Sequence, residues 1–201
     1  MKTRTHLAAV AGAALAVAMA LPAGAADPDR GLYFNAEAGA NWASDVSVGG
    51  GGSAALDIGF RFGAAVGYNI NKYVGVEFDT GWVWNNFKDF DGSLSHIPIM
   101  ANAVFRYPIS TKWEAYAGGG VGGSYSILNV DDFGVSDSSG DFVFAWQGLA
   151  GVRYKLKENM TLGVGYKYFG TAEGNYDIAG ASVSIGNVHN HTVGVVFNMK
   201  F

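Results

Sequence analysis

The chain has 201 residues, of which 49% are hydrophobic, 14% are aromatic and only 15% are charged, and its formal net charge is −4. This acidic balance argues against nucleic acid as a partner. The absence of cysteine excludes disulfides, thiolate metal sites and a thiol nucleophile.

The first 26 residues have the three-part layout of a secretory signal peptide. Lys2 and Arg4 precede a run of Ala, Val and Leu that ends at Leu21, and the small residues after it allow cleavage after Ala25 or Ala26. The run is shorter than the roughly 20 residues that a membrane helix needs. We therefore expect an exported domain of residues 27–201. Without Lys2 and Arg4 it keeps 11 of the 13 basic residues and all 17 acidic residues, so its formal net charge is −6.

Residues 27–201 alternate apolar side chains with polar or small ones, which is the two-residue period of β-strands. The predicted strands are 32–42, 58–70, 74–84, 95–109, 113–127, 141–156, 160–168 and 187–201. Long connections at 43–56, 85–93, 129–140 and 170–186 alternate with very short turns. Outer-membrane barrels have such tight periplasmic turns and longer outside loops. The pattern predicts an all-β fold, an eight-stranded antiparallel up-and-down transmembrane β-barrel.

A soluble, lipocalin-like barrel of the same strand number is the alternative fold. In that fold the apolar face lines a cavity, and the charged residues lie outside. Here aromatic residues gather near the predicted strand ends, among them Trp42, Trp82, Trp113 and Trp146, where interfacial girdles of membrane barrels lie. The last strand also keeps its apolar face up to the terminal Phe201. Both features favour the membrane barrel.

These features carry a resemblance to a known family. Gly- and Tyr-rich strands such as Gly163–Tyr168, and the closing strand Val195–Phe201, resemble the small outer-membrane β-barrels that include the transmembrane domain of OmpA and the opacity-type surface proteins. The resemblance implies location in the cell outer membrane, contact with its lipids and lipopolysaccharide, and assembly by the barrel-insertion machinery, with Phe201 as the assembly signal. We expect a monomer.

Nine charged residues of the predicted strands fall on the inward parity. They are Glu37, Arg61, Glu77, Asp79, Arg106, Glu114, Arg153, Lys155 and Lys167. Eight strands enclose a lumen about wide enough for side chains to fill it, and an unpaired buried ion is costly. We therefore predict a salt-bridge network that plugs the barrel, with a narrow ion path as the alternative. The expected role is structural support of the envelope and presentation of surface loops. A small-solute or ion porin is the alternative, and an adhesin or a lipid A-modifying enzyme is the second alternative.

No metal, cofactor or catalytic site is predicted. His189 and His191 share one strand face but have no evident third ligand, and His96 faces inward as a hydrogen-bonding residue. A lipid A-modifying hydrolase would need a Ser, a His and a carboxylate in mutual reach, and no such set is evident. The acidic outside loops are expected to be solvated, with a weak divalent-cation rim as the alternative. The glycine run 118–123 lacks the Gly-Lys-Ser/Thr of a phosphate loop.

Overall fold

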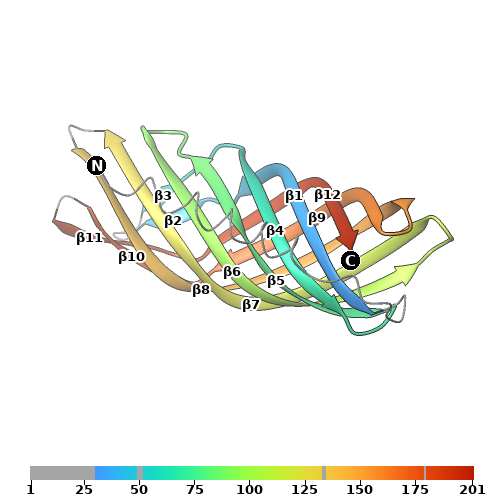
Figure 1. Ribbon diagram of the computed structural model, residues 1–201. Coiled ribbons are helices and arrows are strands. Elements are labelled where there is room, and N and C mark those ends of the chain that lie inside the picture. The colour runs from blue at the N-terminus through green and yellow to red at the C-terminus, as the bar shows by residue number, and fades with distance from the viewer. Residues whose placement is uncertain (1–29, 49–51, 133–134, 179) are drawn as a thin grey trace.

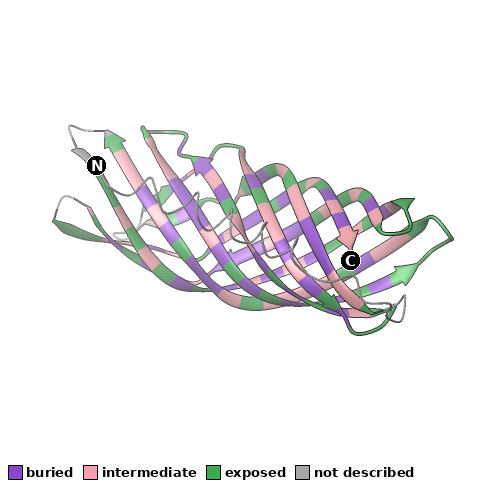
Figure 2. Cartoon of the chain, viewed as in Figure 1, coloured by how far each residue is buried: buried purple, intermediate pink, exposed green. Residues whose placement is uncertain are grey.

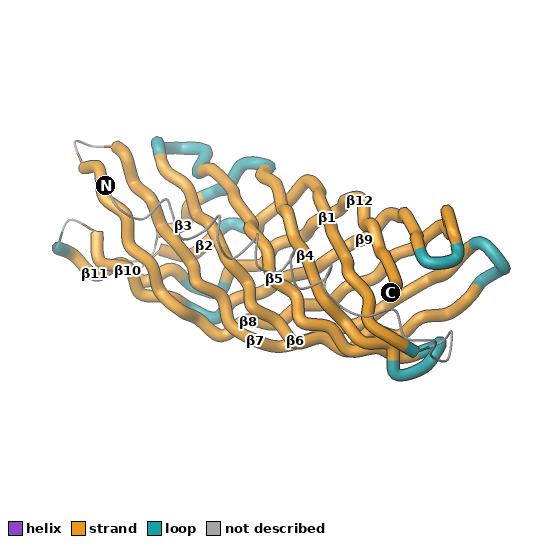
Figure 3. Tube along the Cα trace, in the orientation of Figure 1, coloured by secondary structure: helices purple, strands orange, loops and turns teal. Residues whose placement is uncertain are grey.

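The computed structural model describes residues 30–48, 52–132, 135–178 and 180–201. The predicted signal peptide lies outside the described residues. The described chain forms strands joined by turns and loops (Figure 3), and it contains no helix long and apolar enough to cross a membrane. The strands are β1 (Gly31–Ala43), β2 (Val46–Val48), β3 (Gly52–Ala54), β4 (Gly59–Asn69), β5 (Val74–Asn86), β6 (Gly92–Pro108), β7 (Trp113–Asp132), β8 (Val135–Lys157), β9 (Met160–Thr171), β10 (Gly174–Ile178), β11 (Ala181–Ile185) and β12 (Val188–Lys200).

Eight of these strands close into a barrel in the order β1-β12-β9-β8-β7-β6-β5-β4 (Figure 1). Every neighbouring pair is antiparallel. The barrel closes between the first and last strands, whose register runs from Tyr33 opposite Lys200 to Ala43 opposite Asn190. Closure pairs the backbone groups of every strand, as a structure in hydrocarbon requires. The predicted fold class is confirmed.

Burial alternates along the barrel strands, as the green and purple bands in Figure 2 show. In β6, for example, Asn102 and Arg106 are buried whereas Ala101 and Phe105 are exposed. The exposed face carries large apolar side chains, including Phe62, Phe78, Phe105, Val121, Phe142 and Phe144. A lipocalin-like barrel would have the opposite arrangement. Lipid is the solvent that suits this outer wall.

Six barrel strands are longer than predicted, and β7 and β8 exceed their predicted ranges the most. β7 has 20 residues and β8 has 23, whereas a strand needs only about 9–11 residues to cross a bilayer. Their pairing continues to Asp132 opposite Val135, so most of the predicted loop 129–140 is a projecting hairpin. Outside the membrane, backbone hydrogen bonds between two strands can form without an apolar face. β7 and β8 therefore stay paired beyond the residues that alternate between apolar and polar.

The first and fourth long connections form a second sheet, which was not predicted. Its strand order is β10-β11-β2-β3, and it lies at the end of the barrel opposite the C-terminus (Figure 1). We call this end, which carries the long connections, the long-loop end, and the other the short-turn end. β10 is also held by the projecting hairpin: the backbone N–H of Asn175 donates to Asp141 Oδ2 (2.9 Å) and that of Asp177 to Ser139 Oγ (2.9 Å).

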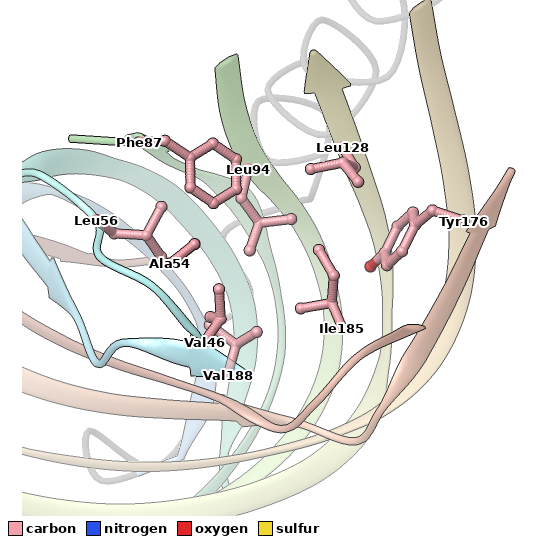
Figure 4. Packing of buried hydrophobic residues seen from close by; sticks show 9 residues of the cluster. All are labelled: Val46, Ala54, Leu56, Phe87, Leu94, Leu128, Tyr176, Ile185 and Val188. Atoms are coloured by element: carbon pink, nitrogen blue, oxygen red, sulfur yellow. The ribbon is translucent and has the colours of Figure 1, made fainter. Parts of the chain in front are cut away.

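A buried apolar cluster packs this sheet against the long-loop end of the barrel (Figure 4). We call it the outer apolar cluster; its members are Val46, Ala54, Leu56, Phe87, Leu94, Leu128, Tyr176, Ile185 and Val188. Barrel strands and connections both contribute to it. Burial raises the pKa of the Tyr176 hydroxyl, with a smaller opposing effect from its hydrogen bond with Ser126, so the cluster stays neutral at physiological pH. The connections thus have their own core, in addition to exposed acidic side chains.

Candidate functional site in the barrel interior

Four of the predicted inward charges meet at the middle of the lumen. Arg61 Nε lies 2.5 Å from Glu37 Oε1, and Arg61 Nη2 lies 3.3 Å from Asp79 Oδ1. Lys167 Nζ lies 2.8 Å from the same Glu37 oxygen and 2.5 Å from Asp79 Oδ2. Two carboxylates and two cations therefore alternate in one group, which we call the central charge cluster. It ties β1, β4, β5 and β9 together across the barrel.

Glycine on a neighbouring strand makes room for these long side chains. A Cβ atom added at Gly63 would lie 2.8 Å from Glu37 Oε1, too close for a real contact. Gly63 stands directly opposite Glu37 in the pairing of β1 with β4. The absence of a side chain at Gly63 on β4 thus leaves room for the carboxylate of Glu37 on β1, so a narrow lumen can hold the central charge cluster.

Glu77 is buried without a cationic partner among the described residues. Its carboxylate accepts hydrogen bonds from Tyr33 Oη (3.1 Å), Asn35 Nδ2 (2.8 Å) and Asn102 Nδ2 (3.3 Å). Gln147 Nε2 donates to Asn102 Oδ1 (2.8 Å) and to Asp79 Oδ2 (3.4 Å), and so connects this group to the central charge cluster. Neutral donors therefore compensate a charge for which the sequence predicted an ion pair.

Two arginines lie nearer the short-turn end and stack on tyrosine rings. The Arg106 guanidinium lies 4.7 Å from the Tyr33 ring centroid, and that of Arg153 lies 3.9 Å from the Tyr116 centroid. Both distances are in the cation–π range. Arg153 Nη1 is also 3.8 Å from Glu114 Oε1. Aromatic faces thus take much of the role that the prediction gave to carboxylates.

Lys155 is placed differently from the other eight predicted residues. It keeps the inward parity, but its side chain is exposed at the short-turn end. The strand has left the enclosed lumen here, and its register with β9 is interrupted between Lys155 and Lys157. The structure therefore brings Lys155 to the mouth of the barrel and not into the charge network.

A layer of amides between the central charge cluster and the outer apolar cluster was not predicted. Asn41 Nδ2 donates to Asn85 Oδ1 (2.7 Å) and to Asn190 Oδ1 (2.8 Å), and Thr192 Oγ1 donates to Asn41 Oδ1 (2.7 Å). All four residues are buried. Their inward parity on β1, β5 and β12 is visible in the sequence, but parity alone does not show which amides meet across the barrel. His96, also buried, shares a 2.7 Å hydrogen bond with Ser126 Oγ.

Little space remains between these layers. A cavity of about 30 Å³ lies between the central charge cluster and Tyr116. Such a volume holds about two water molecules, since one water needs roughly 10–15 Å³ of this kind of space. Eight strands enclose a lumen about wide enough for side chains to fill it, and this cavity is small on that scale.

The two histidines of the last strand lie on the outer wall. His189 Nδ1 and Tyr168 Oη are 2.7 Å apart, as are His191 Nδ1 and Tyr166 Oη. The His189 ring stacks on Tyr168, with centroids 5.9 Å apart. No group of three or more His, Cys, Asp or Glu that could hold a metal occurs within the described ranges.

The closed barrel and its apolar outer wall define an integral outer-membrane β-barrel protein. The model of the outer membrane protein beta-barrel domain family matches residues 11–201, and the chain belongs to this family. The 25 kDa outer-membrane immunogenic protein of Brucella canis is 31% identical over 136 residues, which are 62% of this chain and 58% of that protein. The protein of the same name from Brucella abortus biovar 1 is 32% identical over the same shares. The chain thus matches less than two thirds of these relatives' length.

Solved structures support the same fold. Neisserial surface protein A is 23% identical, with a TM-score of 0.60 over 85% of this chain and 97% of that one. OprG from Pseudomonas aeruginosa is 16% identical, with a TM-score of 0.55 over 86% of this chain and 98% of that one. At these identities the likeness concerns the fold alone. The family and its relatives place the protein in the cell outer membrane.

Proposed function

We propose that this protein is a non-conducting outer-membrane barrel that supports the envelope and displays its long-loop end at the cell surface. The single observation that carries the proposal is the succession of side-chain layers across the lumen. The outer apolar cluster, the amide layer and the central charge cluster follow one another from the long-loop end. Each layer draws residues from several strands, so none is a single side chain that could swing aside.

Solute efflux tests the closed lumen directly. Refolded protein in liposomes loaded with a small neutral sugar and with potassium is expected to retain both as well as protein-free liposomes do. Liposomes that contain a conducting porin serve as the positive control, and a heat-dependent gel shift verifies folding. Rapid efflux that depends on the amount of folded protein would favour the porin alternative.

The name of the relatives supports surface display. The Brucella proteins are described as immunogenic, and here the long-loop end offers exposed residues on a folded sheet and hairpin. Because the chain has no cysteine, single cysteines report exposure cleanly. On intact cells we expect a membrane-impermeant maleimide to label Asp89→Cys at the long-loop end but not Lys72→Cys at the short-turn end, although both positions are exposed in the structure. Equal labelling on intact cells would contradict this orientation.

The end of the last strand is the proposed contact for the assembly machinery. The backbone N–H of Phe201 donates to the Leu32 carbonyl (3.0 Å), and the side chain is 41% exposed on the outside of the barrel. A side chain that contributes little to the folded core is free to act in recognition. We expect Phe201→Ala to lower the amount of heat-modifiable barrel in the outer membrane while refolding in detergent is unchanged. If both fall together, Phe201 acts through stability.

A further inference from the structure

The short-turn end of the barrel contains a second cavity, separate from the closed lumen. It has a volume of about 60 Å³. Its walls come from the β6–β7 turn, the β8–β9 turn and the end of β12, and Arg153 stands between it and the smaller inner cavity. By the orientation of outer-membrane barrels this end faces the periplasm.

Two residues that line this cavity, Arg153 and Thr161, each have a buried polar atom without a partner among the described residues. Arg153 Nε and Thr161 Oγ1 have no hydrogen-bond partner within the described part of the chain. The Arg153 side chain is only 3% exposed, and Thr161 is 9% exposed. Leaving a buried donor unsatisfied is costly, more so when the donor is charged. A ligand in this cavity would therefore lie beside two residues whose polar atoms are unsatisfied.

The charges around the cavity favour an anion as that partner. Lys112, Lys155, Lys200 and Arg153 line it against two acidic residues, Glu114 and Glu158. Glu114 lies 3.8 Å from Nη1 of Arg153 and so does not satisfy Nε. The Tyr116 ring holds the guanidinium in place at 3.9 Å. An incoming anion would thus meet a positioned, water-shielded N–H group.

Hydroxyl groups add donors suited to oxygen ligands. Ser110 Oγ accepts the backbone N–H groups of Lys112 (3.3 Å) and Trp113 (3.1 Å), which leaves its own hydrogen able to donate. Thr161 supplies a second hydroxyl in the same cavity. Charge-assisted hydrogen bonds to carboxylate or phosphate are stronger than neutral ones.

We propose that this cavity, the short-turn pocket, binds a small oxyanion: a carboxylate or phosphate group carried by a periplasmic molecule. Arg153 Nε and Thr161 Oγ1 donate to the anion, and Lys155 neutralises it from the open side. Anion binding here is independent of the proposed non-conducting lumen, because the short-turn pocket lies outside the three side-chain layers of the lumen.

The Arg153 side chain provides the readout. In ¹⁵N-labelled protein refolded in a maltoside detergent, which contains no phosphate, the ¹⁵Nε–¹Hε signal of Arg153 is identified by its loss in Arg153→Lys. Sodium acetate, sodium phosphate and sodium chloride are then titrated at equal ionic strength. We expect a saturable shift with acetate or phosphate and only a small, non-saturating one with chloride. If acetate binds more tightly than phosphate, the natural ligand carries a carboxylate group; if phosphate binds more tightly, it carries a phosphate group.

Two variants separate binding from general charge. Lys155→Gln is expected to weaken binding about two- to fivefold, the size of a partly exposed ion pair. Lys157→Gln, on the same strand end but outside the cavity lining, should leave it unchanged, and Thr161→Val should weaken binding without loss of stability. Equal shifts with chloride, no saturation with either oxyanion, or equal effects of the two lysine variants would overturn the proposal.

Discussion

Arg61 is fully buried and contacts both carboxylates of the central charge cluster. Removing one partner from such a group leaves a buried charge without compensation, which costs about 3–5 kcal/mol. We expect Arg61→Met to lower the free energy of unfolding by about that amount, measured by urea denaturation of the refolded barrel in lipid vesicles.

Lys155→Met is the matched control for this variant, because Lys155 has the same predicted inward parity as Arg61 but is exposed. Its effect should stay within about 0.5 kcal/mol. A partial rescue of Arg61→Met by Asp79→Asn would show that the cost comes from uncompensated charge. Equal effects of Arg61→Met and Lys155→Met would contradict the assignment of Arg61 to the core of the network.

Gly67 lies directly opposite Tyr33 in the pairing of β1 with β4, and a Cβ there would overlap the Tyr33 ring. That ring in turn supports Arg106. Because overpacking forces neighbours off their rotamers, we expect Gly67→Ala to destabilise the barrel by about 1–3 kcal/mol. Gly148→Ala is the control, since its nearest neighbouring atom would be 4.0 Å away. The two denaturation midpoints give the comparison, and coincident midpoints would show that the lumen is loosely packed.

The sequence predicts the face of each charged residue but not its partner. Alternation assigns Glu37 and Lys167 to the interior, yet the contact between them joins residues 130 positions apart and depends on how the closed barrel staggers its strands. Arg106 is an example of a residue whose face, but not its partner, can be predicted from the sequence. Its inward parity is clear from the sequence, whereas its stacking on Tyr33 depends on a glycine two strands away.

At the scale of elements, eight strands could be predicted because a long two-residue period is a strong signal. The second sheet could not, since β2 and β3 have three residues each and β10 and β11 five. Segments that short show no period of their own. Their pairing depends on the outer apolar cluster, which gathers residues from three connections and three barrel strands.

This dependence gives a prediction for the second sheet. Ile185 is buried in the outer apolar cluster, while Ser182 on the same strand is exposed. We expect Ile185→Ala to speed hydrogen exchange in β2, β3, β10 and β11 by loosening their shared core, with the membrane-spanning parts of the barrel unchanged. Ser182→Ala should leave hydrogen exchange unchanged both in the second sheet and in the membrane-spanning parts of the barrel. Faster exchange throughout the barrel would mean that the cluster and the wall unfold together.

At the scale of the whole molecule, the barrel reverses the arrangement of a soluble protein, with apolar side chains outside and charges within. The outer wall suits lipid, and successive groups of buried side chains lie across the lumen. The two ends differ: the long-loop end holds the outer apolar cluster, whereas the short-turn end has a cavity lined by four basic and two acidic side chains. The proposed structural and surface-display role rests on these side-chain layers and on the folded long-loop end.

Single-channel recording in a planar bilayer tests the sealed lumen most directly. Folded protein is inserted together with a small amount of a conducting porin, which proves that insertion occurred, and the added conductance per barrel is measured. Our account predicts no steady openings from this barrel and no change on Glu77→Gln. Discrete openings that require folded protein, and whose ion selectivity changes in Glu77→Gln, would contradict it and establish a pore.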